Sequence, residues 1–202
     1  MFKKTHLAVA LTLATLMLLS TAILANKGDL KPEFPAPDQS GDCQEYCGPV
    51  IEVARLGTFE AELRGTLTAR AGREYNDNGR KAVPIVVMGS AMRGYVEGLG
   101  ETMIWLDKSR PLTGSFLREN KAGTNFPATQ VMRSHLLLRT DALPGQTFRS
   151  IGPFTVESQG MKYWPPQDAE FVLVEPVEFE DINAPGEVVV RLLSGEAVVG
   201  SS

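Results

Sequence analysis

Apolar and polar residues alternate strictly along the segment from Thr58 to Arg70. One side carries Phe59, Ala61, Leu63, Leu67 and Ala69, and the other carries Thr58, Glu60, Glu62, Arg64, Thr66, Thr68 and Arg70. A period of two residues is that of a half-buried β-strand and fits no α-helix. The pattern therefore predicts a strand that turns one face towards a core.

Several more segments have strand character, and turn residues separate them. Asn78-Gly79 predicts a hairpin turn before the apolar, β-branched segment 82–97. Further strands are predicted at 102–107, 130–140, 147–151, 154–157, 171–175, 177–180 and 187–193. Helical turns are expected only near 43–47 and 110–120. The chain is therefore predicted to be all-β, an antiparallel β-sandwich or barrel of roughly 8–10 short strands.

The N-terminus has the pattern of an export signal. Lys3 and Lys4 precede an uncharged apolar stretch from Leu7 to Ala25, and small residues such as Ser20 and Ala22 follow at its end. This order is typical of a signal peptide. The stretch also has about the length needed to cross a bilayer, so residues 1–25 are predicted to be a signal peptide or an uncleaved anchor helix.

The rest of the chain divides into a linker and one domain. Residues 26–42 contain Pro32, Pro35 and Pro37, which favour extended, unpaired chain, and we expect a Pro-rich linker there. The all-β domain is expected over residues 43–199, followed by a short tail at 200–202. A domain of this size can bury a single hydrophobic core.

Composition narrows the classes of function. The 202 residues carry a formal net charge of −4, and this acidic balance argues against a nucleic-acid partner. Only two Cys and two His are present, which excludes a zinc finger and a disulfide-dense scaffold. We therefore expect an exported protein, periplasmic or extracellular, that meets a membrane only through an uncleaved N-terminal segment.

Cys43 and Cys47 form a C-x3-C motif at the start of the predicted domain. An exported chain meets an oxidising compartment, so a small disulfide between them is predicted. One turn of chain would bring the two Cβ atoms within bonding reach. Two free thiols are the alternative, and in that case the pair could bind copper.

The motif also resembles the cysteine loop of the binuclear copper site in cytochrome oxidase subunit II. The resemblance covers the six residues from Cys43 to Gly48 and implies a copper-handling function. The sequence departs from that family at two ligand positions, where Ile51 replaces the His and Ala54 replaces the Met. The domain is accordingly expected to need no cofactor, with copper as the alternative.

His135 is the one histidine outside the leader and the natural candidate for acid–base chemistry. Adjacent residues on a strand point to opposite faces, so Ser134 cannot serve as its nucleophile. A secreted hydrolase would need His135 to meet another serine in space. We otherwise expect a half-exposed or cross-strand-bonded histidine that contributes to ligand binding.

Tyr163 and Trp164 lie just before Pro165-Pro166, and this placement suggests two exposed rings at a rigid turn. Such rings can stack on a sugar or anchor a protein partner. Together with the absence of a recognisable catalytic set, they predict a non-catalytic binding or assembly module with a protein or carbohydrate ligand. A copper-handling protein and a secreted hydrolase remain the alternatives.

Overall fold

The computed structural model describes residues 32–110 and 114–201, and within these ranges the chain is all-β with no helix. The predicted leader and the first residues of the predicted linker lie outside this description. The fourteen strands are β1 (Ser40–Val53), β2 (Gly57–Glu60), β3 (Leu63–Ala71), β4 (Tyr75–Asp77), β5 (Arg80–Val96), β6 (Gly100–Leu106), β7 (Phe116–Glu119), β8 (Ala128–Ser134), β9 (Leu136–Thr140), β10 (Phe148–Ser150), β11 (Phe154–Met161), β12 (Ala169–Leu173), β13 (Val177–Asp181) and β14 (Ala184–Ser201).

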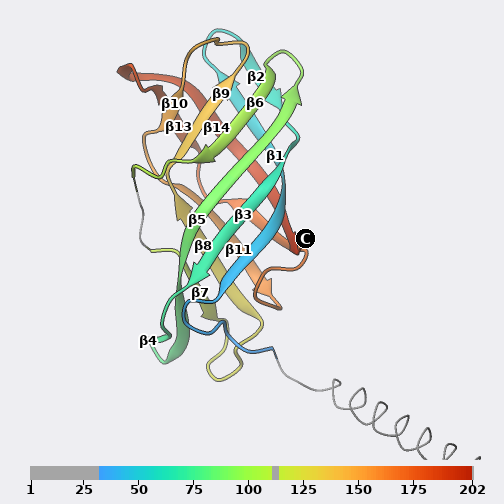
Figure 1. The fold of residues 1–202 in the computed structure, drawn as a ribbon, viewed down its shortest axis with the longest axis vertical. Helices are drawn as coiled ribbons and strands as arrows, with labels where there is room; N and C mark the ends of the chain where they lie inside the picture. Colours follow the sequence, from blue (N-terminus) through green and yellow to red (C-terminus); the bar gives the residue numbers. More distant parts are fainter. Residues whose placement is uncertain (1–31, 111–113, 202) are drawn as a thin grey trace, which may run out of the picture. The chain divides into compact units, whose positions relative to one another are not determined.

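All strands belong to one antiparallel sheet whose hydrogen-bond ladder closes on itself twice (Figure 1). One ring runs β1-β3-β5-β6-β9-β10-β13-β14 and returns to β1. The other replaces its middle strands and runs β1-β3-β5-β7-β8-β11-β12-β14. The four shared strands therefore connect two closed halves, and β1 and β14 pair along eleven residue positions.

The strands follow the sequence pattern closely. The five residues predicted to face the core between Thr58 and Arg70 are buried or half-buried, as expected. The Asn78-Gly79 turn joins β4 to β5, with positive φ at both residues, and Gly79 N–H donates to Asn76 Oδ1 at 2.8 Å. At Gly65, β3 passes so close to β5 that a Cβ would lie 1.9 Å from the carbonyl oxygen of Ala91. Only glycine permits that approach.

Three sequence expectations need correction. Residues 43–47 form no helical turn because they lie in the middle of β1. The segment 110–120 contains the strand β7 instead of a helical turn. The strand number exceeds the predicted range, partly because 58–70 and 130–140 each divide into two strands. The second division falls at His135, which lies between β8 of one ring and β9 of the other.

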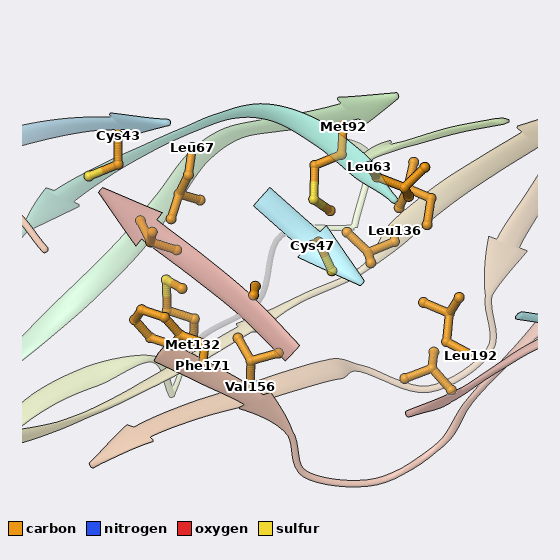
Figure 2. Packing of buried hydrophobic residues seen from close by; sticks show 14 of the residues in the cluster. Cys43, Cys47, Leu63, Leu67, Met92, Met132, Leu136, Val156, Phe171 and Leu192 are labelled. Atoms are coloured by element: carbon orange, nitrogen blue, oxygen red, sulfur yellow. The ribbon is translucent and has the colours of Figure 1, made fainter. Parts of the chain in front are cut away.

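The core fills the space inside the closed sheet. Phe148, Phe171 and Phe179 are fully buried, and most of the strands contribute buried leucine, isoleucine, valine or methionine side chains. Figure 2 shows several of these side chains meeting across the interior. An interior void near Cys47 and Met92 measures about 10 Å³, roughly enough for a single water. Side chains, not solvent, therefore occupy the interior there.

The residues before β1 pack against the same body. Phe34 meets Phe126 edge to face, with ring centroids 5.3 Å apart. Asp38 N–H donates to the Ala71 carbonyl oxygen at 2.9 Å, and Ala71 N–H donates to the Gln39 carbonyl oxygen at 2.9 Å. The second part of the predicted linker is thus attached to the domain. Within the described ranges, no helix has the length and apolar character needed to cross a membrane.

Candidate functional site

The C-x3-C motif lies on an extended strand, and this decides the positions of its side chains. Cys43, Glu45 and Cys47 point into the core, whereas Gln44 and Tyr46 point outwards. Four residues of strand span about 13 Å, at roughly 3.3 Å per residue. Both cysteines are free thiols, and Figure 2 shows them in separate parts of the interior. The predicted disulfide is therefore not supported, because a strand replaces the turn it required.

Burial also affects the protonation of the two thiols, on which any binding of copper would depend. Burial raises the pKa of Cys43 to about 11 and that of Cys47 to about 12, with the nearby Glu45 carboxylate adding to both shifts. A metal ligand must be a thiolate, so these environments disfavour the binding form. Among the described residues, no group of three or more His, Cys, Asp or Glu could hold a metal ion.

Glu45 is an acid inside the core. Burial raises its pKa from 4.5 to about 7, although a hydrogen bond donated by Ser90 Oγ at 3.4 Å acts in the opposite direction. Its two inward neighbours on β1 are the neutral thiols, so no cation on its own strand face stabilises the carboxylate. Glu45 is therefore poised to change its charge near neutral pH.

His135 lies at the break between β8 and β9, where it is buried instead of half-exposed and makes the cross-strand contact that was the other expectation. Its Nδ1 is 3.2 Å from Ser150 Oγ, and its carbonyl oxygen accepts the N–H of Asp107 at 2.8 Å. Burial lowers the pKa of His135, and the guanidinium of Arg110 lowers it further. The structure thus brings a serine to His135, as a hydrolase would require.

That serine is not accessible to a substrate. Ser150 is fully buried, and its Oγ also accepts the N–H of Leu136 at 3.1 Å. Arg110 donates to the Ser150 carbonyl oxygen at 2.7 Å. These bonds join the segments that cross between the two closed halves. The geometry therefore supports a structural role for the histidine and serine.

Tyr163 and Trp164 are separated by the structure. Trp164 is buried at 9% exposure, beneath Gly41 of β1, where a Cβ would lie 3.5 Å from its ring. Tyr163 is 44% exposed and lines a surface hollow of about 390 Å³. Trp164 therefore anchors the β11–β12 loop, and Tyr163 alone is available to a ligand.

This hollow shares lining residues with two others, and we call the three together the outer groove. It shares Asp168 with a hollow of about 370 Å³ over β1, β3 and β14, and it shares Gln159 and Glu170 with one of about 410 Å³ over β11 and β12. Its principal lining residues are Gln44, Tyr46, Arg64, Glu157, Gln159, Lys162, Tyr163, Gln167, Asp168, Glu170, Val172, Val174 and Val198. The groove combines exposed rings, aliphatic side chains, amides and carboxylates.

Sequence reasoning missed most of the groove. Tyr46 and Asp168 were not singled out, although strand alternation through residues 40–53 would have placed Tyr46 outside. A separate hollow of about 550 Å³ lies over β5, β6 and β9, between Arg93 and Arg139. It shares no lining residue with the three joined hollows, and none of these four surface hollows contains His135.

Comparison with known proteins identifies a fold but no family. No protein-family model matches the chain, and no curated protein sequence matches it. The structure is similar to that of DynF, from the dynemicin biosynthesis pathway of Micromonospora chersina, with a TM-score of 0.71. The match covers 84% of this chain and 83% of DynF at 16% sequence identity. At this identity the likeness shows that the two chains share a fold.

Proposed function

We propose that this protein is an exported, non-catalytic binding module that holds an extended ligand in the outer groove. The observation that carries the proposal is that three neighbouring hollows share Gln159, Asp168 and Glu170 as lining residues. Binding sites are typically concave and combine apolar surface with a few polar groups that orient the ligand. The groove has this character, whereas the buried His135–Ser150 pair offers no access for a substrate.

The same proposal includes the architecture and the location. The twice-closed hydrogen-bond ladder favours a barrel over two separate stacked sheets, and it provides a rigid support for a site on its outer face. The lysines, apolar stretch and small residues of the leader favour export to the periplasm, envelope or medium. Neither a nucleic-acid partner nor a cofactor is part of the proposal.

Binding can be tested with a panel of immobilised polysaccharides and immobilised peptides. Glu170 lies where two of the hollows meet, so Glu170→Lys should weaken retention of the bound class at least about tenfold. Glu97 is exposed in a turn away from the groove, and Glu97→Lys is the matched charge-reversal control. Equal retention of both variants, or no retention of the unaltered protein by any probe, would overturn the proposal.

Export is tested separately by the intact mass of the protein recovered from the host's envelope or medium without added reductant. A chain that begins near Ile23 or Asn26 supports a cleaved signal peptide. A full-length chain in the membrane fraction supports the anchor. Recovery of full-length chain from the cytosol alone would contradict export.

A further inference from the structure

The tyrosines of this chain are distributed unevenly over its surface. The sequence contains four, and two of them, Tyr46 and Tyr163, line the outer groove at 39% and 44% exposure. Tyr75 and Tyr95 are also exposed but lie on β4 and β5, outside it. An exposed phenol ring presents a large apolar face with no charge and little conformational freedom. The groove therefore has two rigid platforms at separate points along its length.

Tyr46 is held in place by its neighbours on the sheet. On the outer face of β1 it pairs with Arg64 of β3 on one side and with Val198 of β14 on the other. The Arg64 guanidinium lies over the Tyr46 ring, 5.4 Å from its centroid. A ring fixed in this way loses little entropy when a ligand stacks on it.

Tyr163 is positioned by the buried residue that follows it. Trp164 packs under β1 and fixes the loop between β11 and β12, so Tyr163 projects from an anchored backbone. Lys162 and Gln167 line the same hollow, which therefore also contains a cation and an amide.

Asp168 lies between the two tyrosines. It lines the hollow of Tyr46 as well as that of Tyr163, and a Cβ at Gly200 would lie 3.6 Å from its Oδ1. The carboxylate thus extends over β14, on the path from one hollow to the other. Within the described part of the chain, no hydrogen bond to its carboxylate is present, which leaves both oxygens available to ligand hydroxyl groups.

These features point to one class of ligand. We propose that the groove binds a neutral polysaccharide, with one sugar on Tyr46, another on Tyr163, and hydroxyl groups between them donating to Asp168. This inference rests on the proposed binding function and specifies its ligand. Sugar rings offer C–H faces to an aromatic platform and hydroxyl groups to carboxylates and amides, and the groove supplies both kinds of partner.

Two observations disfavour other polymers. Where the groove passes over β14 and β1, these strands are hydrogen-bonded on both sides, since β14 pairs with β12 and β1, and β1 pairs with β14 and β3. On the other side of the groove, β12 pairs with β11 only at Val172 and Leu173. A peptide therefore finds no open edge for strand addition along β14 and β1, and only the three residues 169–171 of β12 offer a short one. The groove is also lined by four acids, the exposed Glu157, Asp168 and Glu170 and the buried Glu45, against Arg64 and Lys162. This balance disfavours a sulfated or uronic-acid chain.

The test uses the full mature chain and soluble gluco-, manno- and xylo-oligosaccharides of increasing length, with affinity measured by calorimetry. We expect affinity to rise with length until both tyrosines are engaged. Tyr46→Ala, Tyr163→Ala and Asp168→Asn should each weaken binding about tenfold or more, while Tyr75→Ala and Tyr95→Ala should change it less than about twofold. Tyr46→Phe and Tyr163→Phe keep the platforms and should retain most of the affinity.

The outcomes distinguish the carbohydrate inference from the broader proposal that the groove is a binding site. Peptide retention that Glu170→Lys abolishes, without oligosaccharide binding, would overturn the carbohydrate inference and leave the binding function standing. Oligosaccharide binding that is unchanged in Tyr46→Ala and Tyr163→Ala would also overturn it. Failure of every probe would overturn both proposals. Thermal unfolding of each variant verifies that a lost affinity reflects the ring or carboxylate and not a lost fold.

Discussion

The two faces of β1 show how one short motif can serve two purposes. Inside, Cys43, Glu45 and Cys47 contact the core, and the pKa of each is raised by burial. Outside, Gln44 and Tyr46 line the groove. The residues are adjacent in sequence, yet strand alternation assigns chemistry that looks reactive to the interior and ordinary polar residues to the candidate site. Residue type alone is therefore a poor guide to where binding occurs.

The sharpest contrast is expected on β12, where Phe171 is fully buried and its neighbour Val172 is 52% exposed. Phe171→Ala removes a large core side chain and should lower the free energy of unfolding by about 3–5 kcal/mol. Val172→Ala should stay within about 0.5 kcal/mol of the unaltered protein. Urea denaturation measures both, and similar losses would mean that the closed sheet does not separate inside from outside.

The ionisation of Glu45 tests how well the inner face of β1 tolerates a charged side chain. Its folded pKa of about 7 exceeds its ordinary value of 4.5, so the folded state binds the proton more tightly than the unfolded state does. The resulting stabilisation is complete below the ordinary pKa and is lost as pH rises through about 7, an effect of about 3 kcal/mol. Glu45→Gln removes this dependence.

The variant and the unaltered protein should therefore have similar stability in acid, and the variant should be more stable above about pH 8. Chemical denaturation at several pH values provides the comparison. A constant difference between the two proteins at all pH values would show that the Glu45 carboxylate is solvated.

The reactivity of the two thiols also tests whether the inner face of β1 is closed to solvent. Both should resist a maleimide in the folded protein and react after denaturation, and reductant should leave the unfolding temperature unchanged. Cys47→Ser buries a hydroxyl in place of the thiol and should cost about 1–3 kcal/mol. An oxidised protein two hydrogens short in mass, with an unfolding temperature that falls in reductant, would restore the disulfide hypothesis.

The smallest effect on stability is expected on the outer face of β1. Tyr46→Ala removes an exposed ring and its contact with the Arg64 guanidinium, which is worth about 0.5–1 kcal/mol at an exposed site. Thermal unfolding measures this loss. A decrease as large as that for Phe171→Ala would mean that Tyr46 supports the fold and is not set aside for a ligand.

Much of the fold could be predicted because alternation is a local signal. Residues 58–70 show it without interruption, and the Asn78-Gly79 turn follows from the backbone freedom of those two residues. The motif from Cys43 to Cys47 was misinterpreted because two cysteines at close spacing suggest a turn, whereas pairing with β3 and β14 keeps the segment extended. Tertiary pairing outweighed the local signal.

The candidate site was harder to predict because it joins segments that are distant in sequence. Tyr46 and Tyr163 face one groove only because β12 lies beside β14, and β14 beside β1. No local sequence pattern predicts this order of strands in the sheet. Trp164 and Tyr163 look alike in sequence, and only the packing of the loop under Gly41 shows which ring is covered.

The pairing of β1 with β14 also has a consequence for the order of events during synthesis. The first strand of the described body forms its seam with the last, so neither ring can close before residues near Ser201 are available. Contacts this far apart in sequence form late and slowly. Until then the edge of β1 that pairs with β14 has no partner, and a chain truncated before Ala184 should fail to complete the fold and should be bound by chaperones or degraded by proteases.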